Sequence, residues 1–473
     1  MEHQGGTAGE VDLLFYRHIR NLDRGIPLGY NEYRNDRVPY GIMNETRFLH
    51  TYIVGGTGQG KTNLLQVMML GDLYSGRGFT CIDPHGDLSD FILAHCGPSF
   101  ADRMEDVVYL DPSDVEWPFA FNLLECHREE DKAKIASDVV SVFRRMYISL
   151  GWGPRLEDLL RNGLLLLLDN PNTTLIDLVR ILTQPLMRDQ MLANCTNPTV
   201  RAFWEQEFSA WTESSQSQAV APVLNKVRTF LVYPPMRNIL GQPRSTFNFL
   251  DIMNTNKVVI LKLASTAIGA ENAQLLGSLV VGEEWRTAIA RPAGARNPHH
   301  LYVDEFQTFV TDSFAEILTQ ARKFRLSLTL AHQYVSQIPD TIATAVLENA
   351  GTKIVFNSGE KTARIMGPYF RPIEPRHILG LPRFHAYVAT LGGAGGTDKL
   401  PPILTRVFPP LDGNAAEGEL VKRYSQSRFC RPREDVVKEL QEKVAEMGDT
   451  LEKVLFKDDG EEGEAYGGQF PLQ

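Results

Sequence analysis

The sequence lacks any apolar run long enough to cross a membrane. Its best run, Leu164–Leu168, is followed at once by Asp169, whereas a membrane-spanning helix needs about 20 apolar residues. The first residues, MEHQGGTAGEVD, do not show the charged-then-apolar pattern of a signal peptide. We therefore expect a soluble, cytoplasmic protein, and we expect any recruitment to the inner face of the membrane to be made through a partner.

Cysteine is also scarce, and none is spaced as CxxC. An odd number of scattered cysteines indicates a reducing compartment and predicts neither a disulfide framework nor structural zinc. The adjacent pair Cys126-His127 is best explained as incidental. The five cysteines are Cys81, Cys96, Cys126, Cys195 and Cys430.

The sequence has no excess of positive charge. Its formal net charge of -10 argues against a surface that coats nucleic acid, although a local basic channel remains compatible with it. With 43% apolar and 22% charged residues, the chain has an ordinary globular balance, which excludes disorder throughout. A length of 473 residues predicts two or three domains, or one large domain with an insertion.

Short apolar segments alternate with helical patterns at both ends of the chain, which predicts a mostly parallel α/β sheet. We expect a helix over 61–74 and another that starts at Asp87, with Asp87 as its cap. The expected strands are 51–54, 79–83, 107–110, 258–263, 301–303, 326–330, 353–356, 385–391 and 403–407.

Apolar residues follow helical spacing between these two parts, which predicts an all-α insertion over residues 125–245. The sheet-forming domain is then expected over 1–124 and 246–412. Residues 413–473 are polar; we expect a helix near 434–455 and an acidic, disordered tail, KDDGEEGEAYGG. The tail is explained either as a solubilising end or as a docking segment.

The stretch GGTGQGKT matches the phosphate-binding pattern GxxxxGK[ST] between a predicted strand and a predicted helix. The glycines let backbone N–H groups turn toward phosphate oxygens, Lys61 reaches the β- and γ-phosphates, and Thr62 holds Mg²⁺. A glycine turn without a ligand is the structural alternative. The predicted nucleotide-binding residues are Gly55, Gly56, Thr57, Gly58, Gln59, Gly60, Lys61 and Thr62.

The stretch HHLYVDEFQTF places Asp304 and Glu305 directly after an apolar strand. Ligands in open α/β sheets bind at the carboxyl ends of strands. We expect Asp304 to orient Mg²⁺ with Thr62, and Glu305 to polarise the attacking water. Alone, such an acidic pair would be explained equally well as a strand that ends in solvent.

The stretch QARKFRLSLTLAHQY supplies two further candidates. Gln333, after the predicted strand, is placed to sense the γ-phosphate, and Arg322 is a candidate arginine finger for a neighbouring subunit's site. A solvated basic helix end is the alternative for the arginine. The stretch NTNKVVI lacks the aspartate of a guanine-reading NKxD motif, so we favour ATP.

The stretch CIDPHGDL follows the second strand and ends in a tight turn. Asp83 lies beside the phosphate-binding strand, and we consider two roles for it: a contact in the nucleotide site, or turn and cap chemistry alone.

Five stretches in this order, HTYIVGGTGQGKT, CIDPHGDL, LYVDEFQTF, ARKFRLSLTLAHQ and LENAGTKIVFN, resemble the HerA/FtsK superfamily of ring-forming DNA motors. The helical insertion is similar to that of the type IV coupling proteins, the TraD/TraG group. The resemblance covers residues 45–410. It implies a RecA-like P-loop ATPase domain, an all-α domain near the DNA entrance, a homohexamer and ATP-driven pumping of single- or double-stranded DNA.

By position in the family, Lys61 and Thr62 correspond to the Walker-A pair and Asp304 and Glu305 to the Walker-B pair. Gln333 corresponds to the glutamine of the third motif, and Arg322 to the arginine finger. The resemblance also implies relaxosome, secretion-channel or nuclease partners.

Coupling proteins usually begin with transmembrane helices and HerA proteins with a small β-barrel, and the sequence predicts neither. We therefore favour a soluble relative of the coupling proteins that moves DNA in conjugation or type IV secretion. The alternatives are a HerA-like translocase or helicase in DNA processing or anti-phage defence, and a protein-translocating secretion ATPase. A slow nucleotide switch or an inactive scaffold is disfavoured by the complete set of motifs.

Overall fold

The computed structural model describes residues 25–33, 36–126, 128–311, 314–392, 398–409 and 411–445. The predictions for the first residues, for His127 and for the acidic tail lie outside these ranges. Within them, no helix combines the length and the apolar character needed to cross a lipid bilayer.

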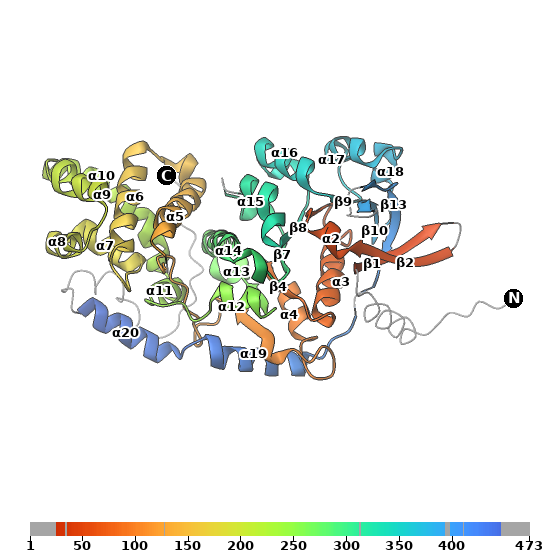
Figure 1. Cartoon of the computed structure of the whole chain (residues 1–473), viewed down its shortest axis with the longest axis horizontal. Helices are drawn as coiled ribbons and strands as arrows, with labels where there is room; N and C mark the ends of the chain where they lie inside the picture. Colours follow the sequence, from red (N-terminus) through yellow and green to blue (C-terminus); the bar gives the residue numbers. More distant parts are fainter. Residues whose placement is uncertain are drawn as a thin grey trace.

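The centre of the molecule is one large sheet (Figure 1), whose strands lie in the order β2-β1-β13-β10-β9-β3-β8-β7-β4-β6-β5. From β9 to β5 all neighbouring strands are parallel, which confirms the predicted fold class. The strands are β1 Gly25–Tyr33, β2 Asp36–Met43, β3 Thr51–Val54, β4 Gly78–Asp83, β5 Val107–Leu110, β6 Val258–Lys262, β7 His299–Val303, β8 Leu326–His332, β9 Thr352–Phe356, β10 His385–Ala389 and β13 Ile403–Val407.

One end of the sheet is antiparallel. The hairpin β1–β2, which the sequence analysis did not predict, pairs with β13, and β13 leads through β10 to β9. The register of the hairpin shifts between Pro27 and Gly29, so a bulge accommodates a proline inside a paired strand. A further short pair, β11 Leu391–Gly392 and β12 Asp398–Lys399, lies apart from the main sheet.

Helices cover both faces of the sheet because alternate side chains of each strand point to opposite faces. In β3, Ile53 packs in the same apolar cluster as the first helix after it, while Val54 packs in the cluster on the other face. On the first face lie α3 Lys61–Tyr74 and α4 Asp87–Leu93. The remaining helices of this part are α2 Asn44–Arg47, α12 Phe249–Asn254, α13 Ser265–Ile268, α14 Ala270–Ala290, α15 Phe314–Gln320, α16 Asp340–Asn349, α17 Glu360–Met366 and α18 Pro375–Leu379.

A separate group of helices, the helical body, lies beside the sheet (Figure 1) within the range proposed for the insertion. Thr174 caps α7 through a capping box with Asp177. The helices of the body are α5 Lys132–Tyr147, α6 Pro154–Leu168, α7 Leu175–Thr183, α8 Pro185–Ala193, α9 Pro198–Ala202, α10 Glu213–Leu231 and α11 Pro234–Leu240.

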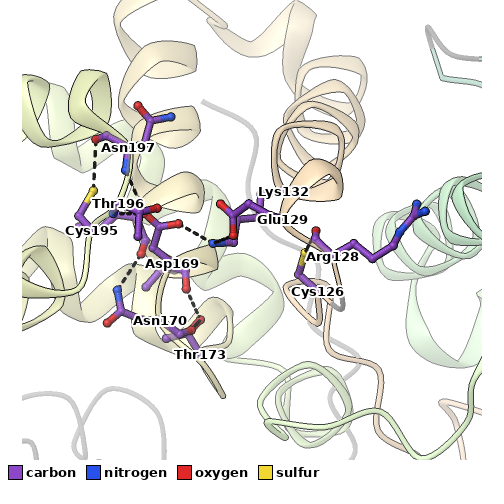
Figure 2. Close-up of polar contacts among 12 residues, drawn as sticks. Cys126, Arg128, Glu129, Lys132, Asp169, Asn170, Thr173, Cys195, Thr196 and Asn197 are labelled. Carbon is purple, nitrogen blue, oxygen red and sulfur yellow. Dashed lines mark hydrogen bonds and ion pairs between the residues drawn. The ribbon is translucent and has the colours of Figure 1, made fainter. Parts of the chain in front are cut away.

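Asp169 organises the polar contacts at one end of the helical body (Figure 2). Its carboxylate accepts from Lys132 Nζ at 2.8 Å and from the backbone N–H of Thr196 at 2.7 Å. Burial alone would raise the pKa of Asp169, but these bonds outweigh it and lower the pKa. Cys126 and Cys195 lie in separate parts of this region, and neither forms a disulfide; their thiols donate to the carbonyl oxygens of Arg128 and Asn197.

Two chain segments connect the helical body to the sheet, and they run side by side. Thr246 N–H donates to the carbonyl oxygen of Ala120 at 3.1 Å, and Asn122 N–H donates to Ser245 Oγ at 3.0 Å. A half-buried ion pair of 2.6 Å between Arg286 of α14 and Asp138 of α5 adds a contact across the same boundary.

The two C-terminal helices form a strap across both parts (Figure 1): α19 Ala415–Phe429 lies against α4 and β5, and α20 Arg433–Ala445 lies against α11. Ser425 Oγ accepts the backbone N–H of Tyr109 at the edge of the sheet. Leu440 is buried against the helical body. The helix α19 was not predicted from the sequence, whereas α20 agrees with the start of the helix expected near 434–455.

Candidate active site

The glycine-rich loop follows β3 and leads into α3, so its backbone has the form that phosphate binding requires. Gly58 and Gly60 have φ of 72° and 115°, in the region that only glycine adopts readily. A Cβ at Gly55 would lie 2.5 Å from Cβ of Phe356, so only glycine allows the loop to pass this close to β9. The predicted loop and the predicted helix over 61–74 are both confirmed.

Lys61 lies inside this loop. Its Nζ donates to the carbonyl oxygens of Gly55 at 2.7 Å and Gly56 at 3.1 Å. Burial lowers the pKa of Lys61, while the negative charges of Glu305 and Asp304 act in the opposite direction. The lysine is therefore held between the loop and the acidic pair, where a γ-phosphate would lie.

Asp304 and Glu305 follow β7 at the carboxyl edge of the sheet, two strands from β3. Asp304 is 5% exposed, and burial together with the adjacent charge of Glu305 raises its pKa to about 6. A divalent cation would favour the charged form of this carboxylate, which is the chemistry predicted for it.

Glu305 has a left-handed backbone, with φ 45° and ψ 47°. This conformation is costly for a residue other than glycine and occurs most often where function requires it. Both carboxylate oxygens accept from amides: Oε1 from Gln333 Nε2 at 3.0 Å, and Oε2 from Gln307 Nε2 at 2.7 Å. The side chain is thereby fixed at the edge of the site.

Gln333 follows β8, the strand between β7 and β3. Besides donating to Glu305, it accepts from Thr57 Oγ1 at 3.2 Å through its own Oε1. One side chain thus connects the glycine loop to the proposed catalytic base. The sequence analysis placed Gln333 near the γ-phosphate but missed Gln307 and the partnership with Thr57, because side-chain amides carry no motif of their own.

Asp83 ends β4, which lies three strands from β3 and not beside it as expected, because β8 and β7 lie between them. Both carboxylate oxygens of Asp83 accept hydrogen bonds from the turn that follows. Its Oδ1 accepts the backbone N–H of His85 and Gly86, and its Oδ2 accepts the N–H and hydroxyl of Ser89. This favours the turn role over a nucleotide contact. The prediction that Asp87 caps α4 is wrong: the N-cap is Gly86, and the end of the helix is held by Asp83.

The three basic residues before β8 differ in their surroundings. Arg322 and Lys323 are exposed. Arg325 instead lies 4.6 Å over the ring of Phe48 and pairs with Glu45 at 3.5 Å. Arg322 is therefore available to a neighbouring molecule, as a finger requires, whereas Arg325 is used within its own chain.

The residues fit a nucleoside triphosphate with Mg²⁺. The glycines of the loop leave backbone N–H groups accessible, and Lys61 provides a cation. Thr62 lies in the first turn of α3, whose N-terminus favours anions. Mg²⁺ in such sites is typically held by few protein oxygens and by the phosphates themselves, and Thr62 and Asp304 would supply the protein ligands.

Residues 32–370, well over half of the chain, match the family of the type IV secretion-system coupling protein DNA-binding domain. No curated protein matches the chain significantly.

Among solved structures, the chain is similar to the plasmid coupling protein TrwB in complex with ADP and Mg²⁺ (TM-score 0.59, 16% identity, 87% of this chain and 95% of that chain). It is also similar to TrwB with the GTP analogue GDPNP (TM-score 0.60, 16% identity, 86% and 94%). VirB4 of Thermoanaerobacter pseudethanolicus is a further match (TM-score 0.56, 13% identity, 84% and 98%). At these identities the likeness establishes the fold.

Proposed function

Since this chain belongs to the family of the type IV secretion-system coupling protein DNA-binding domain, we propose that it is an ATP-driven DNA translocase of conjugative transfer or type IV secretion. The observation that carries the proposal is the fixed position of Glu305 between Gln307 and Gln333, beside Lys61. A switch that only binds nucleotide has no need of a carboxylate held in this way.

The geometry supports the following proposed roles. Glu305 accepts a proton from the attacking water, Gln333 keeps its carboxylate oriented, and Lys61 faces the charge that develops on the γ-phosphate. Thr62 and Asp304 would hold Mg²⁺, which would neutralise charge at the phosphates. TrwB has been solved with ADP and Mg²⁺ and with non-hydrolysable analogues of GTP and ATP, which supports ATP and Mg²⁺ as the ligands here.

We further propose a homohexamer in which Arg322 of one subunit completes the site of the next. Its exposure supports this role, and a head-to-tail contact closes into a ring when the rotation allows. DNA would be moved by its phosphate backbone, with contacts that are sensitive to salt and tolerant of sequence. Relaxosome, secretion-channel or nuclease partners stay predictions of the family.

The test is ATP turnover by the purified protein with and without single- and double-stranded DNA, at low and moderate salt. Glu305→Gln is the inactive reference, and Glu316→Gln, an exposed carboxylate on α15, is its matched control. We expect stimulation by DNA in the wild type and in the control, and loss of about 10²–10⁴-fold in Glu305→Gln. Turnover that ignores DNA would instead favour a protein-moving secretion ATPase.

A further inference from the structure

A second loop is fastened to the glycine loop on the side away from Glu305. Arg383 Nε donates to the carbonyl oxygen of Gly58 at 3.0 Å, and Phe384 N–H donates to the carbonyl oxygen of Gln59 at 2.8 Å. This loop precedes β10, the strand next to β9. Two consecutive residues therefore hydrogen-bond to Gly58 and Gln59, which are consecutive in the phosphate-binding loop.

Asn357, which follows β9, strengthens this connection. Its carbonyl oxygen accepts the N–H of Gly56 at 2.8 Å, while its Nδ2 donates to the carbonyl oxygens of Leu379 and Leu381, both at 3.0 Å. The glycine loop and residues 379–384 are thus held as one unit.

Phe384 has a strained backbone that its neighbours keep in place. Its φ is 63°, a conformation that is rare for a bulky residue. Its N–H donates to the carbonyl oxygen of Gln59, and its carbonyl oxygen accepts the N–H of Val407 at 2.9 Å. Strain that the surroundings maintain in this way is concentrated at ligand sites.

The ring of Phe384 is 41% exposed although one edge packs on the glycine loop. A Cβ at Gly60 would lie 2.9 Å from its Cδ1, so the ring touches the last glycine before Lys61. The guanidinium of Arg383 lies 5.3 Å from the ring centre, a distance suited to cation–π attraction. The result is an aromatic surface at the rim of the site.

The ring of Phe384 lies where we expect the nucleoside end of a bound nucleotide. Lys61, Glu305 and Gln333 place the γ-phosphate on the side of β3 that borders β8 and β7. A nucleotide that extends across the loop from this point would carry its nucleoside toward the opposite side, which borders β9 and β10. Phe384 lies on that side.

We propose that Phe384 is the platform on which the nucleobase of ATP stacks, an inference that rests on the proposed function of this site. Stacking uses the face of a base and does not read its edge, so it favours large purine rings without separating adenine from guanine. The site would therefore bind ATP and GTP with similar affinity.

The experiment measures binding of Mg·ATP, Mg·GTP and Mg·tripolyphosphate by calorimetry, because tripolyphosphate has the phosphates without a base. Phe384→Leu keeps an apolar contact with Gly60 but removes the ring, and Phe384→Trp keeps an aromatic face. Trp117→Ala removes an exposed aromatic residue from a loop after β5 and serves as the control.

We expect Phe384→Leu to weaken ATP and GTP binding by about tenfold and to leave tripolyphosphate binding unchanged. Phe384→Trp and the control should bind all three like the wild type. Equal ATP affinity in Phe384→Leu, or an equal loss for tripolyphosphate, would overturn the platform while leaving the ATPase proposal intact. A wild type that binds neither ATP nor tripolyphosphate would overturn both.

Discussion

Gln333 Nε2 donates a hydrogen bond of 3.0 Å to Glu305 Oε1, and so joins the ends of two neighbouring strands, β8 and β7. Through its Oε1, the same amide accepts from Thr57 of the glycine loop. Any displacement of the loop by a γ-phosphate therefore reaches the proposed base through a single side chain. This explains in physical terms how a glutamine can sense nucleotide and orient a water-activating group at once.

The first prediction concerns this connection. Gln333→Ala should lower ATP turnover by about 10–100-fold with little change in ATP affinity, because it releases Glu305 without removing a group that holds phosphate. Thr57→Val should have a smaller effect, and the double variant should lose less than the sum of the two. Steady-state kinetics and nucleotide binding of the four proteins measure the coupling. Additive losses would show that the two contacts act independently.

The second prediction concerns Asp304, whose pKa is raised to about 6 by burial and by the charge of Glu305. Because the folded state favours the protonated carboxyl, the free energy of unfolding should fall as pH rises from about 4 through 6. Asp304→Asn should remove this loss, gaining on the order of 2 kcal/mol at pH 8 while abolishing Mg²⁺-dependent turnover. Denaturant unfolding at pH 5 and pH 8 tests it, and parallel pH profiles for both proteins would contradict it.

The third prediction concerns Arg322. Arg322→Ala should bind ATP normally but turn it over about 10³–10⁵-fold more slowly, whereas Lys323→Ala, its exposed neighbour, should be close to wild type. Mixing Arg322→Ala with Lys61→Ala subunits should restore part of the turnover, since some interfaces then contain an intact loop and an intact arginine. Mixtures as inactive as either variant alone would count against action between subunits.

The fourth prediction concerns the strap. A chain ended after residue 412 should lose several kcal/mol of stability, at roughly 1.5–3 kcal/mol for each buried apolar side chain, because Val421, Val436 and Leu440 are buried. A chain ended after Ala445 keeps both helices and should unfold like the full protein. Thermal unfolding compares the two. Equal stability of both truncated chains would show that the strap contributes little.

The sequence predicted the parts of the fold that depend on local pattern. Buried parallel strands such as β3 and β5 read as continuous apolar segments, and the glycine loop has a fixed spacing. The hairpin β1–β2 contains Pro27, which is unusual inside a strand. It pairs with β13, which lies more than 350 positions further along the chain, so local sequence does not indicate this pairing. In α19, Val421 is the fully buried large apolar residue, and such a helix has no strong periodic signal.

The candidate site likewise combines residues that local motifs predict with a residue whose proposed role depends on the folded structure. Lys61, Thr62, Asp304 and Glu305 lie in contiguous motifs, so the order of amino acids along the chain is enough to propose them as site residues. Phe384 could not be identified in this way, because its significance arises only when residues 379–384 fold back onto the glycine loop.

The strap has a mechanical consequence. The two paired connecting segments at 120–122 and 245–246 lie side by side, and alone they would act as one axis about which the helical body could swing. The chain between α19 and α20 lies against this axis, because Arg431 N–H donates to the carbonyl oxygen of Pro118 at 3.0 Å. From there α19 extends onto the sheet and α20 onto the helical body. This third attachment restrains the swing, so we expect the helical body to move together with the sheet when the nucleotide edge is displaced.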